Sequence, residues 1–126
     1  MFSDQTGRFP VTSYKGNQYV MVLFETRSNN ILVEPMRSRV SGEMCRAYQT
    51  LVDRLKECGI KPTMHILDNE CSAEFKTLIS ENEMKYQLVP PYDHRRNVAE
   101  KAIQTFEDHF VAVLCGTDDN FPLQLW

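Results

Sequence analysis

The sequence predicts one α/β domain built on a mixed five-stranded sheet with helices on both faces. Up to residue 36, short runs rich in β-branched and aromatic residues alternate with turn signals, which indicates an antiparallel meander. After residue 40, patterns typical of helices alternate with strand-like runs, as expected for parallel crossover units. The expected order is β-β-β-α-β-α-β-α: strands 1–3 form the meander, and strands 4 and 5 are parallel.

The three strands of the meander are expected at residues 2–11, 18–25 and 31–36. Gly7 and Pro10 weaken the end of the first strand, and Pro35 suggests that the third lies at an edge of the sheet. Gly16 can adopt the positive φ that the turn between the first two strands needs. The run "YVMVLFE" in the second strand is nearly all apolar, which favours a central position.

A helix is expected at residues 41–58, with Ser41 as its N-cap and Gly59 at its end. Strand 63–67, helix 72–82, strand 86–89 and helix 95–114 follow, and Ser72 is a competent cap for the second helix. The first helix has one apolar face, because its apolar residues recur at spacings of three and four: Met44, Ala47, Tyr48, Leu51, Val52 and Leu55.

The composition is that of an ordinary globular domain. Of the 126 residues, 42% are hydrophobic and 25% are charged, and no apolar run is long enough to cross a membrane. The formal net charge of −3 argues against a free-standing, tight nucleic-acid binder. It leaves open an enzyme that contacts nucleic acid through metals and one local basic patch.

Three acids stand where they could meet. Asp68 joins a strand to a helix in "ILDNECSAEF"; alone it could be a turn or cap residue, but Ser72 already fills the cap role. Asp4 lies inside the first strand, where an acid needs solvent, a partner or a metal. Glu100 lies near the start of the last helix, where a glutamate is usually a solvated residue.

We expect strands 1 and 4 to be adjacent and parallel. Asp4 and Asp68 then emerge at one edge of the sheet, and the last helix can bring Glu100 over them. Three converging carboxylates cannot all remain ionised without a cation. Oxygen ligands select Mg²⁺ or Mn²⁺, and two such ions could activate a nucleophile and stabilise a leaving oxygen at a phosphodiester.

A polar segment precedes the last helix. His94, Arg95 and Arg96 form either a solvated face or a phosphate clamp beside Glu100, and Asn97 could cap the helix or orient DNA. We expect His65, within the fourth strand, to be a half-buried, hydrogen-bonded residue and not a ligand.

The segments "FSDQTGRFPVTS", "YVMVLFE", "HILDNE" and "QLVPPYDHRRNVAEKAIQTF" resemble the catalytic core of retroelement integrases, especially those of copia-type retrotransposons. The resemblance covers nearly the whole chain and implies a ribonuclease H-like fold. It also implies an Asp4, Asp68 and Glu100 triad that binds two divalent ions. Two positions depart from the family pattern: Glu70 replaces a common glycine, and Val98-Ala99 precedes Glu100 where Asn-Gly is frequent.

The resemblance implies DNA integration, in which water nicks DNA near its ends and the resulting 3′-hydroxyl attacks target DNA. DNA and further copies of the chain would be the partners, and the nucleus the location. Because the family carries flanking domains, we expect residues 1–126 to be a core truncated at both ends. Two alternatives stay open: an inactive remnant that binds nucleic acid or mediates assembly, and a generic nuclease.

Overall fold

The computed structural model describes residues 1–67, 71–88 and 96–126, apart from the side chains of Arg96 and Asn97. The elements follow the predicted order. The strands are β1 (Phe2–Gln5), β2 (Tyr19–Glu25), β3 (Asn30–Met36), β4 (Met64–Leu67) and β5 (Lys85–Leu88). The helices are α1 (Ser41–Glu57), α2 (Ala73–Glu81), α3 (Arg96–Cys115) and a short 3-10 helix, η1 (Leu123–Leu125).

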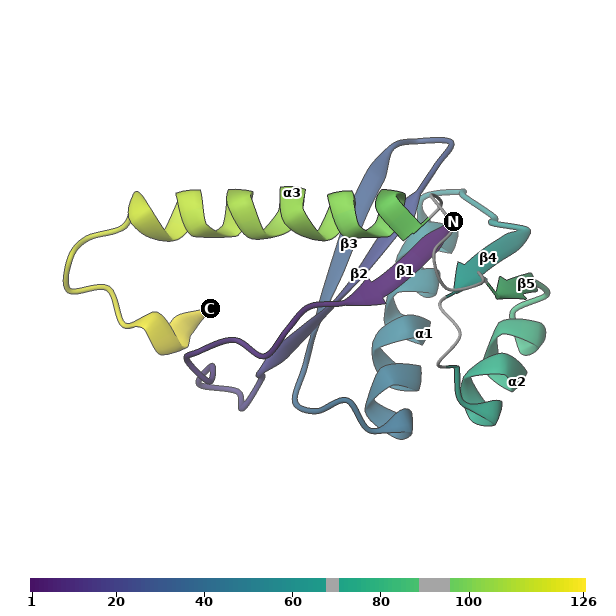
Figure 1. Cartoon of the computed structure of the whole chain (residues 1–126), viewed down its shortest axis with the longest axis horizontal. Helices are drawn as coiled ribbons and strands as arrows, with labels where there is room; N and C mark the ends of the chain where they lie inside the picture. Colours follow the sequence, from purple (N-terminus) through teal and green to yellow (C-terminus); the bar gives the residue numbers. More distant parts are fainter. Residues whose placement is uncertain (68–70, 89–95) are drawn as a thin grey trace.

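The five strands form one mixed sheet in the order β3-β2-β1-β4-β5. β1 is antiparallel to β2 and parallel to β4, and β4 is parallel to β5. The predicted meander and the predicted adjacency of strands 1 and 4 are therefore confirmed. Figure 1 shows α3 along one face of the sheet and α1 and α2 on the other. None of the helices described combines the length and apolar content of a membrane span.

The alternation of side chains along β2 divides the core into two layers. Met21 and Leu23 belong to the layer beneath α1 and α2, whereas Val20 and Val22 pack with Ala102 of α3. The layer beneath α1 is the larger. Met44 of the predicted apolar face is only partly buried, and the layer buries the other five residues of that face: Ala47, Tyr48, Leu51, Val52 and Leu55. The sheet thus separates the layer under α1 and α2 from the layer under α3, and successive residues of a strand point alternately to the two.

Strand β1 ends at Gln5, well before the predicted residue 11. Beyond it, Thr6 N still donates to Val20 O (2.9 Å) and Phe9 N to Gln18 O (2.8 Å), but the ladder is irregular. Pro10 has no N–H to continue it. The chain therefore leaves the regular sheet two residues after Asp4.

The glycine turns match the prediction, but the start of α1 does not. Gly16 and Gly59 have φ values of 83° and 75°, at the first hairpin and just after α1. The N-cap of α1 is Val40, with no side-chain cap bond, and not Ser41. The Ser41 hydroxyl instead contacts Ser72 Oγ at 3.0 Å and bonds to Glu74, so it links the start of α1 to that of α2.

The C-terminal segment packs back onto the domain, which the sequence did not predict. The ring of Trp126 lies 4.8 Å from that of Phe9 and 6.0 Å from that of Phe110, and its Nε1 donates to Val11 O at 2.7 Å. Leu123 and Leu125 of η1 remain exposed.

Candidate active site

Strand register fixes the face on which Asp4 lies. Asp4 pairs with Val22 of β2, and Val22 packs in the α3 layer. Directly opposite residues of two paired strands project to the same face, so Asp4 is directed to the α3 side. Its Oδ1 accepts a hydrogen bond from Gln5 N at 2.8 Å. Asp4 is half-buried, one residue before the carboxyl end of β1.

Helix α3 covers this same face. It packs against β1 and β2, with Ala102 buried against the sheet and Ile103 and Phe106 beside it. Glu100 is exposed and lies near the amino end of α3, next to this packed stripe. The structure therefore places Asp4 and Glu100 on elements that share one face of the sheet.

The remaining predicted site residues lie at the limits of what the structure describes. β4 is described to Leu67, and Asp68 lies outside the described residues, as do His94 and Arg95. Arg96 and Asn97 open α3, without described side chains. Within the described part of the chain, no group of three His, Cys, Asp or Glu residues could hold a metal. One of the three predicted acids, Asp68, lies outside that part.

The donor chemistry of the predicted site suits a hard divalent ion. Asp4 and Glu100 offer carboxylate oxygens, and Asp68 would add a third carboxylate. Oxygen-only sets of this kind favour Mg²⁺ or Mn²⁺ over zinc. The residues present therefore fit the ions that the sequence predicts.

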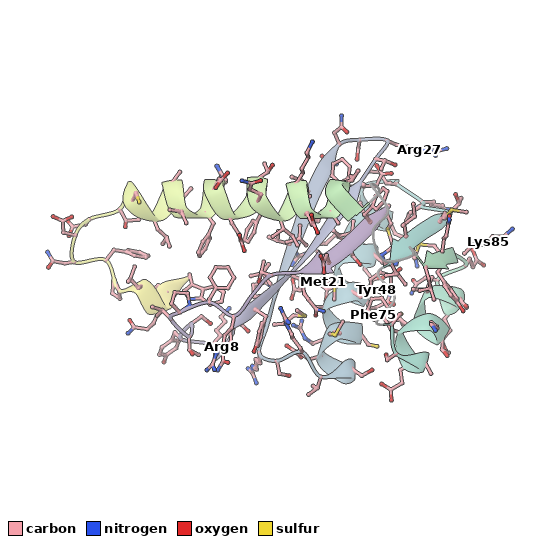
Figure 2. All side chains as sticks on the ribbon, in the orientation of Figure 1. Arg8, Met21, Arg27, Tyr48, Phe75 and Lys85 are labelled. Carbon is pink, nitrogen blue, oxygen red and sulfur yellow. The ribbon has the colours of Figure 1, made fainter. Side chains whose placement is uncertain are left out.

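His65 lies on the opposite side of the sheet, under the junction of β1 and β4. It is fully buried, not half-buried as predicted. Its Nε2 is 2.8 Å from Ser3 Oγ, and its ring stacks on Tyr48 with centroids 5.1 Å apart. Tyr48 in turn packs on Phe75 at 4.7 Å, and Figure 2 shows the two side by side between the sheet and the helices. Nδ1 has no partner within the described residues.

A cavity of about 260 Å³ opens at the carboxyl end of β1. It is lined by residues of β1, of the two helix starts and of the segment before α1: Ser3, Asp4, Gln5, Met21, Arg39, Ser41, Met44, Leu67, Cys71, Ser72 and Phe75. The sequence analysis missed Arg39. Its signal was weak: a single basic residue in the connection between a strand and a helix.

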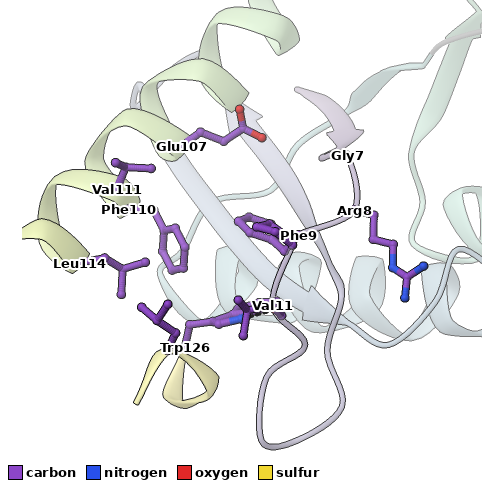
Figure 3. A pocket seen from close by; sticks show the side chains of 11 residues that line it. Gly7, Arg8, Phe9, Val11, Glu107, Phe110, Val111, Leu114 and Trp126 are labelled. Atoms are coloured by element: carbon purple, nitrogen blue, oxygen red, sulfur yellow. Dashed lines mark hydrogen bonds between the residues drawn. The ribbon is translucent and has the colours of Figure 1, made fainter. Parts of the chain in front are cut away.

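A second cavity, of about 350 Å³, lies between α3 and the segment that follows β1, and neither Asp4 nor Glu100 lines it (Figure 3). The rings of Phe9, Phe110 and Trp126 form much of its wall, with Leu114 beside them, and Glu107 is its one acidic lining residue in the described part of the chain. It is almost entirely apolar and contains no cluster of carboxylates. The carboxyl end of β1 is therefore the better candidate for chemistry.

Comparison with known proteins gives structural matches only. No model of a known protein family matches the chain, and no curated protein matches it. A chain from the simian T-cell lymphotropic virus intasome, solved in complex with PP2A regulatory subunit B56 gamma, has a TM-score of 0.71 and 16% identity. That match covers 97% of this chain and 42% of the other. The catalytic core domain of BIV integrase has a TM-score of 0.68 and 15% identity, over 93% of this chain and 72% of that domain.

These matches identify the fold. The chain has the ribonuclease H-like architecture of retroviral integrase catalytic cores over nearly its whole length, as the resemblance in sequence implied. It spans less than half of the intasome chain that it matches.

Proposed function

We propose that this chain is the catalytic core of a DNA integrase, a metal-dependent polynucleotidyl transferase and endonuclease. The observation that carries the proposal is the register that directs Asp4 to the α3 face, with β4 parallel to β1 on its other side. Asp68 follows β4 directly in sequence, and Glu100 belongs to the helix on that face. This is the arrangement in which one edge of the sheet can gather three acids.

In this proposal each residue has one role. Asp4, Asp68 and Glu100 hold two Mg²⁺ or Mn²⁺ ions, which when bound supply the positive charge that a phosphodiester needs to be attacked and cleaved. His94, Arg95, Arg96 and Asn97 contact DNA phosphates at the start of α3 and orient the strand. The substrates are the ends of the element's DNA and a target DNA.

The wider context of the proposal rests on the resemblance. A retrotransposon origin, a nuclear location and assembly into homo-oligomers are what integrases of this kind imply. The match to a chain of a viral intasome supports assembly into a larger complex. Residues 1–126 would then be one core domain within a longer protein.

The test is cleavage of a labelled DNA duplex with and without Mg²⁺. We expect nicking that needs the metal and that is lost, by at least about a hundredfold, in Asp4→Asn, Asp68→Asn and Glu100→Gln. Glu107→Gln is the matched control, because Glu107 lies on the same helix as Glu100 but lines the apolar cavity, which neither Asp4 nor Glu100 lines.

The net charge of −3 and the departures at Glu70 and before Glu100 favour the alternative, an inactive remnant that binds nucleic acid or mediates assembly. If the parent chain cleaves no DNA in Mg²⁺ or in Mn²⁺, and its stability is unaffected by either ion, the remnant is the correct description.

A further inference from the structure

The cavity at the carboxyl end of β1 has one cation among its described lining residues, Arg39. Arg39 belongs to the connection between β3 and α1, whereas Asp4 and Gln5 line the same cavity from β1. The cavity therefore places a positive charge next to a predicted catalytic acid.

The guanidinium of Arg39 is held in place although the residue is exposed. One of its nitrogens, Nη2, donates to the backbone oxygen of Thr6 just beyond β1. Its central carbon lies 5.0 Å from the centroid of the Tyr19 ring, a cation–π distance. Both contacts are to the backbone or to an aromatic face, so they orient the group without neutralising it.

Other arginines near α1 contrast with Arg39. Arg46 forms ion pairs with Glu34 and Glu43, and Arg54 pairs with Glu34. Arg39 forms no ion pair with any residue that the structure describes. An oriented guanidinium that no described carboxylate pairs with is well suited to a phosphate, which it can bind through two parallel hydrogen bonds.

We propose that Arg39 is a substrate-positioning residue that binds a backbone phosphate of the DNA strand beside Asp4. The inference rests on the proposed function and extends it to the other side of the candidate centre, since the segment at 94–97 precedes α3 whereas Arg39 precedes α1. The positive charge of Arg39 offsets the repulsion that the Asp4 carboxylate exerts on a phosphate there.

The experiment measures binding of a fluorescein-labelled 20-base-pair DNA duplex by anisotropy over a series of NaCl concentrations, in EDTA. Arg39→Ala should weaken binding by roughly tenfold at low salt and reduce the slope of log affinity against log salt by about one. Arg39→Lys keeps the charge but not the planar pair of donors, so it should restore the slope and only part of the affinity.

Arg27→Ala is the matched control. Arg27 lies in the β2–β3 turn, beyond the amino end of β1, and Figure 2 shows it at the periphery of the molecule. Arg27→Ala removes the same charge from the opposite end of the sheet. It should change the affinity for DNA less than twofold and leave the salt slope unchanged. Equal effects of Arg39→Ala and Arg27→Ala on affinity and slope would overturn the proposal, because a general loss of charge would explain both.

Two further results separate this proposal from the proposed function. Unfolding in urea checks that Arg39→Ala remains folded. If it does not, Arg39→Gln is used in its place, because glutamine keeps a donor for Thr6 O. If no DNA is cleaved but the salt slope still falls in the Arg39 variants, the integrase function fails while the phosphate contact stands. If Asp4→Asn abolishes nicking while the Arg39 variants bind like the parent chain, the reverse holds.

Discussion

His65 shows how a single residue can shape the support beneath a site. Burial, aided by the nearby positive charge of the amino terminus, lowers its pKa from 6.5 to about 3, so the ring is neutral in the folded protein. Its contact with Ser3 ties β4 to β1, one residue before Asp4. Tyr48 and Phe75 pack around the ring from α1 and α2. Its position beneath the β1–β4 junction makes it a structural residue and not a metal ligand.

The lowered pKa of His65 predicts a pH-dependent stability. The unfolded chain takes up a proton on this residue below pH 6.5, whereas the folded chain does so only near pH 3. Stability is therefore fully present above pH 6.5 and is lost as the pH falls towards 3. Between pH 7 and pH 5 the contribution to the free energy of unfolding should fall by roughly 2 kcal/mol.

Urea unfolding at pH 7 and pH 5 tests this. His65→Gln, which cannot titrate, should lose less stability over this interval than the parent chain, by about that amount. The exposed His109 serves as the control, and His109→Gln should behave like the parent. An unchanged pH dependence in His65→Gln would mean that the buried ring does not control it.

At the scale of elements, the residues just before α2 allow a helix cap to be distinguished from a proposed metal ligand. Ser72 Oγ accepts a hydrogen bond from Phe75 N at 3.2 Å, which confirms the predicted cap. Ser72→Ala should therefore cost about 1 kcal/mol of stability without metal. Asp68→Ala should cost little, or should even stabilise the metal-free protein by relieving repulsion from Asp4 and Glu100.

The comparison is made by urea unfolding in EDTA with both variants side by side. Asp68→Asn is added because asparagine can still cap a helix but carries no charge. If Asp68→Ala destabilises the protein as much as Ser72→Ala, Asp68 has a structural role, and its place in the triad is lost.

The elements also show what local pattern could predict. The second strand was identifiable because "YVMVLFE" is apolar on both sides, and the structure buries it between two helical layers. The start of α1 could not be identified in this way. Serine is a residue type that often caps helices, but the Ser41 hydroxyl contacts Glu74 and Ser72 instead. The burial of His65 was also predicted wrongly, because a strand of four residues has too little pattern to distinguish a half-buried from a fully buried residue.

At the scale of the molecule, the order of the strands could be predicted from sequence, because crossover connections between parallel strands have one hand and successive strands of a meander are neighbours. The contacts that complete the two cavities could not. Phe9 meets Trp126, and Arg39 meets Thr6, across long stretches of chain with no shared periodicity. Such contacts depend on where irregular segments come to rest, which hydrophobic pattern does not encode.

The final prediction concerns the whole domain, because a metal that bridges β1, the end of β4 and α3 should stabilise all three together. Ions that bind only the folded chain raise its stability, by roughly 2.7 kcal/mol at a concentration 100 times Kd. The melting temperature should therefore be higher in 10 mM MgCl₂ than in EDTA with NaCl added to the same ionic strength. Asp68→Asn should abolish the difference, whereas Glu107→Gln should retain it. Equal melting temperatures for the parent chain in the two buffers would show that the acids do not form a metal site.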